Sequence, residues 1–127
     1  GSDGGLIGSE ENEQILPAVE KAQSEGINVF GPIPADTIFN QAIDGHYDVV
    51  LAQYHDQGHI PIKVHNWEQS VSLNLGLPFI RASVDHGTAF DISGKGIADH
   101  TSLKESIKLA IHVAQNKSLP KFNQQEK

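Results

Sequence analysis

Short apolar runs that alternate with helical segments constrain the fold of this chain most. Residues 27–30 and 48–52 are too short for helices and are rich in branched apolar side chains, as in buried strands. Residues 71–75 alternate apolar and polar side chains, which predicts a half-buried strand, and residues 79–84 predict another strand. Strands alternating with helices predict an α/β fold.

Three segments have helical patterns with start or stop signals. The first is expected to begin after Ser9 as the N-cap and to end at Gly26, which suits a C-cap. A short helix is expected at about residues 36–43. The last helix carries an apolar stripe, and Ser102 with Glu105 predicts a capping box at its start.

The length of 127 residues is enough for one compact domain with a core, and no linker divides the chain. We therefore predict one α/β region over residues 1–127, in which residues 121–127 form a flexible tail. The abrupt start at Gly1-Ser2 indicates either a cloning remnant or a piece of a longer protein.

Composition excludes several classes of function. The net charge is −7 and the nine Lys and Arg residues are scattered, which argues against nucleic-acid binding. There is no cysteine, so disulfides, thiolate metal sites and a thiol nucleophile are ruled out. No apolar run approaches the ~20 residues of a membrane span, and no signal peptide is visible. We expect a cytoplasmic protein.

The densest polar cluster directly follows the predicted strand at 48–52. His55 suits a divalent metal, and the neighbouring Asp56 can orient its ring or bind the ion. A hydrogen-bonded turn without a ligand explains the same residues equally well. His59 would share a face with His55 only on a helix, and Gly58 argues against one, as does Pro61 nearby. We therefore do not pair the two histidines as ligands.

Two cations stand out in this acidic chain, Lys63 and Arg81. Arg81 is expected mid-strand in an apolar stretch, where an unpaired charge would be costly, so it requires an anionic partner. That partner is either a protein carboxylate, the commoner case, or a carboxylate or phosphate of a substrate. The spacing does not choose between these.

A glycine-spaced loop follows the last predicted strand. Its glycines allow a ligand to approach the backbone closely, His86 and Thr88 offer donors, and Asp91 can accept from ribose hydroxyls. The loop is not the G-x-G-x-x-G turn of a Rossmann fold. A structural loop whose glycines need positive φ is the alternative.

Four segments together resemble the 4-hydroxythreonine-4-phosphate dehydrogenase family. They occur in the family's order, and the resemblance covers nearly the whole chain up to the last helix. The segments are GPIPADT at 31–37, YHDQG at 54–58, LGLPFIR at 75–81 and SVDHGTA at 83–89. The family's fold resembles isocitrate and isopropylmalate dehydrogenases, which implies the C-terminal fragment of a larger two-domain subunit.

The resemblance implies a metal-dependent, NAD- or NADP-linked oxidative decarboxylation of 4-phosphohydroxy-L-threonine in pyridoxal phosphate biosynthesis. It implies a divalent metal (Zn, Mg or Co) held by three histidines, of which His55 matches one and the others lie upstream. It also implies a homodimer with the site at the interface. Because two metal ligands are missing, we expect the isolated chain to be inactive.

The resemblance also assigns the site residues. Lys63 and Arg81 match substrate contacts, Lys63 and Asp56 are the catalytic candidates, and His86, Gly87, Thr88, Ala89 and Asp91 match the cofactor loop. Ser72 stands at a substrate position where the family has asparagine, and Asn74, on the same strand face, is the candidate to compensate. This departure favours a paralogue that oxidises D-threonate or D-erythronate 4-phosphate. An alternative of another class is a non-catalytic binding or oligomerisation module.

Overall fold

The structure is a computed structural model that describes residues 4–115. The tail predicted at 121–127 lies outside these residues. The chain divides into two compact units, one up to residue 52 and the other from residue 53. The single α/β region over residues 1–127 stays a prediction.

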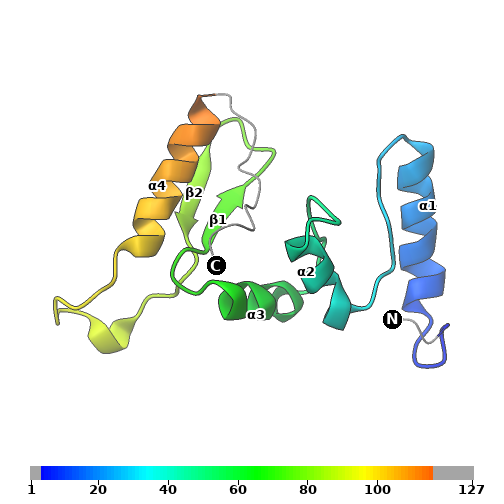
Figure 1. The fold of residues 1–127 in the computed structure, drawn as a ribbon, viewed down its shortest axis with the longest axis horizontal. Coiled ribbons are helices and arrows are strands. Elements are labelled where there is room, and N and C mark those ends of the chain that lie inside the picture. The colour runs from blue at the N-terminus through cyan, green and yellow to red at the C-terminus, as the bar shows by residue number, and fades with distance from the viewer. Residues whose placement is uncertain (1–3, 116–127) are drawn as a thin grey trace. The chain divides into compact units, whose positions relative to one another are not determined.

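The first unit is helical (Figure 1). A π-helical segment, Glu11–Ile15, leads into α1, Leu16–Ser24, and α2 spans Ala35–Ile43, close to the helix expected at 36–43. Glu10 is the N-cap residue of the first segment, and it makes no side-chain cap hydrogen bond. The prediction of Ser9 as the capping side chain is therefore wrong by one position. Ser9 contributes its backbone carbonyl instead.

The end of α1 confirms the predicted C-cap. Gly26 has φ of 86°, in the left-handed region that glycine adopts without a steric penalty. Its N–H donates to the Gln23 carbonyl at 3.0 Å, and the N–H of Ile27 donates to the Ala22 carbonyl at 3.0 Å. These two bonds satisfy carbonyls that the helix end would otherwise leave open.

The strands predicted at 27–30 and 48–52 are wrong. Both segments lack regular secondary structure, and Val49 and Leu51 are largely exposed. A strand requires the hydrogen-bonding groups of a neighbouring strand, and no segment within 4–115 pairs with either run. Their composition fits a strand, but a partner is missing from the described part of the chain.

The second unit is built on a β-hairpin. Strand β1, Val71–Asn74, pairs antiparallel with β2, Arg81–Val84, with Val71 opposite Val84 and Asn74 opposite Arg81. Both strands agree with the sequence prediction, so the mixed helix and strand class is confirmed. Before the hairpin lies α3, His55–His65; after it come a 3₁₀ turn, Phe90–Ile92, and α4, Thr101–Ala114. Figure 1 shows α4 lying along the hairpin.

The described residues contain no buried apolar side chain. Ser102 and Ser106 on α4 are residues that are buried as a whole, and Ser102 Oγ donates to the Ser70 carbonyl at 2.8 Å. The apolar stripe of α4 is only half covered. The core that the length allows is therefore absent from residues 4–115. No helix in this range has the length and apolarity needed to span a bilayer.

The start of α4 differs from the predicted capping box. Ser102 is occupied with Ser70, and Glu105 pairs with Lys108 at 2.7 Å. Asp99 caps the helix instead, because its Oδ1 accepts from the Thr101 N–H at 2.7 Å. The backbone and side-chain hydrogen bonds from Thr101 lower the pKa of Asp99 below its ordinary value of 3.8.

This cap predicts a stability effect that depends on pH. Asp99→Ala should lower the melting temperature at neutral pH, because the start of α4 loses its side-chain acceptor. A lowered folded-state pKa means that the contribution is complete above pH 3.8 and is lost as pH falls through the folded-state pKa. Asp99→Asn keeps the acceptor and is the matched control. Equal melting temperatures for Asp99→Ala and the unmodified protein at pH 7 would contradict the cap.

Candidate functional site

The polar cluster at 55–59 forms the first turn and a half of α3, contrary to the prediction that no helix forms there. The helix tolerates Gly58 and includes Pro61, which together cost several kcal/mol (about 1 and about 3) in an isolated helix. Gln57 stabilises the start of the helix, because its Oε1 accepts a hydrogen bond from the Gln53 N–H at 2.8 Å. Contacts from α3 to the end of the hairpin also stabilise this helix. Such long-range contacts cannot be predicted from the local sequence pattern.

His55 and His59 stack face to face one helical turn apart. Their ring centroids lie 4.1 Å apart and their planes differ by 10°. The Nδ1 of His55 lies 2.7 Å from Oδ1 of Asp56. Because an ionised carboxylate only accepts hydrogen bonds, Nδ1 carries the proton in the neutral form of this imidazole, which leaves the Nε2 lone pair for a ligand. Asp56 therefore orients the ring, as a carboxylate does behind a metal-bound imidazole.

The imidazoles of α3 are the side chains here that suit a divalent metal. His55 is suited to be one ligand, because its side chain is 74% exposed and its tautomer leaves Nε2 as the donor atom. His59 does not suit the same ion: a ligated ion lies in the plane of its imidazole, and two nearly parallel stacked planes share no such position. Residues 4–115 contain no group of three His, Cys, Asp or Glu side chains that could hold a metal. Of the two stacked imidazoles, His55 is therefore the one suited to ligate an ion.

Asp85, directly after β2, joins three other polar side chains. Its Oδ1 accepts from Ser72 Oγ at 3.3 Å and lies 3.5 Å from His59 Nδ1. Its backbone carbonyl accepts from Lys63 Nζ at 3.1 Å. The Asp85 side chain is 7% exposed, and its Oδ2 has no hydrogen-bond partner among the described residues. Lys63 also lies over the Trp67 ring, 5.0 Å from the centroid.

Arg81 is not the buried cation that the sequence predicts. It begins β2, its side chain is exposed, and its Nη1 donates to Oδ1 of Asn74, its cross-strand partner, at 2.6 Å. An exposed guanidinium remains hydrated and does not require an anion. Arg81 and Asp85 lie at opposite ends of the strand, about 13 Å apart at ~3.3 Å per residue. The structure thus brings Lys63 and Ser72 together and leaves Arg81 separate from them.

The loop after Asp85 contains one unusual backbone conformation. Ala89 has φ of 49° and ψ of 46°, which costs an L-residue about 1–2 kcal/mol. Gly94 and Gly96 have positive φ, as the structural alternative for this loop requires, whereas Gly87 does not. His86 Nδ1 is satisfied locally by the Gly87 carbonyl at 2.9 Å. The predicted cofactor residues are all exposed.

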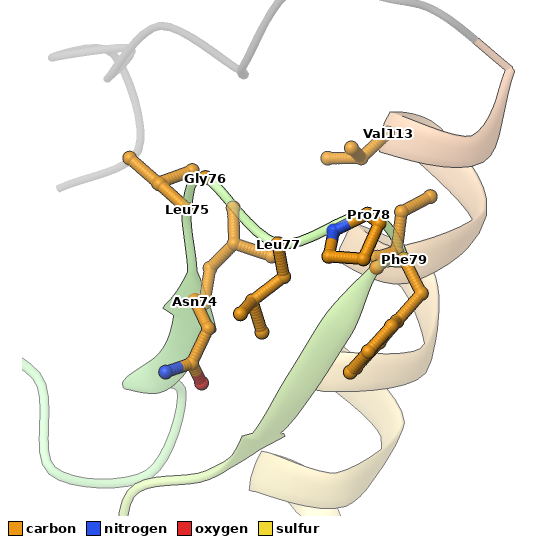
Figure 2. A pocket seen from close by; sticks show the side chains of 9 residues that line it. Asn74, Leu75, Gly76, Leu77, Pro78, Phe79 and Val113 are labelled. Atoms are coloured by element: carbon orange, nitrogen blue, oxygen red, sulfur yellow. The ribbon is translucent and has the colours of Figure 1, made fainter.

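One hollow of about 240 Å³ lies between the hairpin loop and α4 (Figure 2). Its walls are mainly apolar and include Leu75, Leu77, Phe79 and Val113. None of the predicted site residues lines it. The polar cluster around Asp85 and this apolar hollow are therefore different features of the second unit.

Sequence reasoning missed two members of the polar cluster, His59 and Asp85. The signal for His59 was present in the four-residue spacing of His55, His59 and Lys63, which places them along one side of a helix. Gly58 and Pro61 hid that signal by arguing against a helix. Asp85 carried no local signal, because its partners are 13 to 26 residues away.

Known proteins match the chain closely. It is 56% identical over 108 residues to a 4-hydroxythreonine-4-phosphate dehydrogenase of Beijerinckia indica, covering 85% of this chain and 32% of the relative. It is 54% identical over 113 residues to a D-threonate 4-phosphate dehydrogenase of Cupriavidus necator, covering 88% and 34%.

A solved structure agrees with these relatives. A crystal structure of 4-hydroxythreonine-4-phosphate dehydrogenase from Klebsiella pneumoniae superposes with a TM-score of 0.77 at 51% identity, covering 87% of this chain and 34% of that one. The chain thus spans about a third of the length of the relatives it matches. The family model described as "Pyridoxal phosphate biosynthetic protein PdxA" matches residues 1–110, and the chain belongs to this family.

Proposed function

We propose that the longer protein to which this chain corresponds is a dehydrogenase of small phosphorylated hydroxy acids. The proposal rests on one side of α3. There an oriented imidazole, His55, and an anchored cation, Lys63, lie two turns apart. Membership of a family whose relatives are named dehydrogenases of phosphorylated four-carbon acids supports it. The cofactor is a nicotinamide dinucleotide, NAD or NADP.

The reaction is oxidation of a secondary alcohol. The hydroxyl carbon passes a hydride to the oxidised nicotinamide, the hydroxyl releases its proton to solvent, and a carbonyl forms; the resulting β-keto acid then loses carbon dioxide. A bound divalent metal would supply Lewis-acid polarisation of the reacting oxygen. His55 would hold that ion from this chain, with Asp56 fixing its ring.

Lys63 is proposed to bind an anionic group of the substrate or the developing oxyanion. The Asp85 carbonyl takes one of its N–H donors and the Trp67 ring covers its ammonium, which leaves further donors for a ligand. Because these contacts already hold the Lys63 side chain in place, it loses less conformational entropy when it binds a ligand. Ser72 would lie next to this group, and Arg81 would bind a second anionic group from the other end of the hairpin.

Two kinds of substrate fit the proposal: 4-phosphohydroxy-L-threonine, and the 4-phosphates of D-threonate or D-erythronate. Relatives named for 4-hydroxythreonine 4-phosphate and for D-threonate 4-phosphate match this chain at 56% and 54% identity, so identity does not separate them. Ser72 favours the threonate or erythronate phosphates, because it replaces the asparagine that the resemblance places there. Asn74 accepts from Arg81 through Oδ1 and keeps its two amide N–H donors for a ligand, so its compensation for Ser72 stays a proposal. A role in pyridoxal phosphate biosynthesis would follow from the first substrate only.

Other parts of the proposal come from the resemblance. They are a homodimer with the active site at its interface and a cytoplasmic location. The loop from His86 to Asp91 would receive the dinucleotide, and the left-handed conformation of Ala89 supports a backbone shaped for a ligand. The competing proposal is a binding or oligomerisation module without activity.

A substrate panel on the full-length protein tests the proposed function. We expect NAD or NADP reduction with at least one of 4-phosphohydroxy-L-threonine, D-threonate 4-phosphate and D-erythronate 4-phosphate, with a higher kcat/KM for the latter two. Chelation should abolish turnover, and adding Zn²⁺, Mg²⁺ or Co²⁺ should restore it. No reduction with any of the three acids under metal-replete conditions would favour the module without activity.

Substitution of the two cations tests the site. Lys63→Ala and Arg81→Ala should each lower kcat/KM about 10- to 100-fold, because loss of a hydrogen bond to a charged group costs about 1.5–3 kcal/mol. Lys108→Ala is the matched control, since this lysine pairs with Glu105 on α4 away from the cluster. Unchanged kcat and KM in Lys63→Ala or Arg81→Ala would remove that residue from the substrate site.

A further inference from the structure

The polar cluster of the second unit contains two buried atoms without a hydrogen-bond partner among the described residues. They are Nδ1 of His59 and Oδ2 of Asp85, and they belong to side chains that face each other. A buried carboxylate oxygen without a donor is costly, and a buried ring nitrogen without a partner is costly as well. The 3.5 Å separation of His59 Nδ1 and Asp85 Oδ1 is within ion-pair reach, so a small side-chain movement closes a hydrogen bond between them.

The direction of that hydrogen bond is fixed by its acceptor. The Asp85 carboxylate accepts from Ser72 Oγ and has no proton to offer when ionised, so Nδ1 of His59 must be the donor. The carboxylate is approached from two elements, because Ser72 of β1 donates to it and His59 of α3 faces it at 3.5 Å. The His59 ring, 36% exposed, therefore lies with its Nδ1 edge toward the Asp85 carboxylate and with one of its faces against His55.

His55 is far more exposed than His59. Its side chain is 74% exposed and that of its neighbour Asp56 is 70% exposed, so the ring is held by the hydrogen bond to Asp56 and by the stack on His59. An imidazole that is to bind an ion must keep its Nε2 direction, because misdirection by even about 1 Å weakens a site considerably. The flat, anchored surface under the His55 ring is provided by His59.

We infer that His59, anchored by Asp85, is a positioning residue that holds the His55 imidazole in its ligating orientation. His59 is not itself a ligand, since the two rings are stacked with planes only 10° apart. The path runs from the buried carboxylate at the end of β2, through the His59 ring, to the exposed ring of His55. This inference rests on the proposed function, in which His55 holds a divalent metal.

The alternative role for His59 is purely structural, in which it only fastens α3 to the hairpin. That role predicts a loss of thermal stability on substitution and no change in metal affinity. A measurement of metal affinity, with Co²⁺ or Zn²⁺ titrated into metal-free full-length protein by calorimetry, separates the two roles.

The experiment compares four variants of the full-length protein. His59→Ala should weaken metal binding about 10-fold or more, as loss of an outer partner of a metal-bound histidine does. His59→Phe keeps a flat ring under His55 and should recover part of the affinity, even if His59→Ala is poorly folded. His46→Ala, an exposed histidine of the first unit, is the matched control and should bind as the unmodified protein does. His55→Ala should lose tight binding.

The outcomes separate this inference from the proposed function. If His55→Ala abolishes tight binding while His59→Ala and His59→Phe bind metal with unchanged affinity, the positioning role is overturned and the proposed function stands. If the unmodified protein binds no divalent metal, or if His55→Ala binds as tightly as it does, the metal assignment fails and the inference fails with it. A graded loss in the order Phe, then Ala, at position 59 supports the inference.

Discussion

The second unit depends on the contacts that Asp85 and its buried carboxylate make. Asp85 follows the last strand residue and receives the Ser72 hydroxyl from β1, while its backbone carbonyl receives Lys63 from α3. His59 faces the same carboxylate. A helix that contains Gly58 and Pro61 is weak by itself, so these contacts to the hairpin hold it in place. The chemistry proposed for α3 therefore depends on a residue in another element.

The apolar surfaces of this chain are left open by its own residues. No apolar side chain between residues 4 and 115 is buried, and Val49 and Leu51 are more than 80% exposed although they belong to a run with the composition of a strand. The chain spans about a third of the length of its relatives. Covering such surfaces is the main source of stability in a domain, so the helices and hairpin seen here need further apolar contacts to be stable.

Sequence patterns predicted the elements that local interactions determine. The hairpin strands are predicted because apolar and polar side chains alternate in the first strand and because the two strands, close in sequence, pair with each other. The end of α1 is predicted by Gly26. Patterns failed where the outcome depends on distant groups. The run at 48–52 lacks a partner strand, Ser102 bonds to Ser70 instead of capping α4, and α3 forms despite Pro61. The role of His55 came from a resemblance, whereas His59 and Asp85 emerged only from the three-dimensional contacts.

The most direct measurement of this account is a double-mutant cycle between His59 and Asp85, read as the free energy of metal binding to the full-length protein. Asp85→Asn removes the charge that anchors the ring and leaves the carbonyl that binds Lys63. If Asp85 acts through His59, the double variant should bind metal no more weakly than His59→Ala. The loss caused by Asp85→Asn alone then disappears in the double variant, which is a coupling free energy between the two residues of about 1 kcal/mol. If the two losses simply add, the two residues act independently, and the account of the α3 site is contradicted.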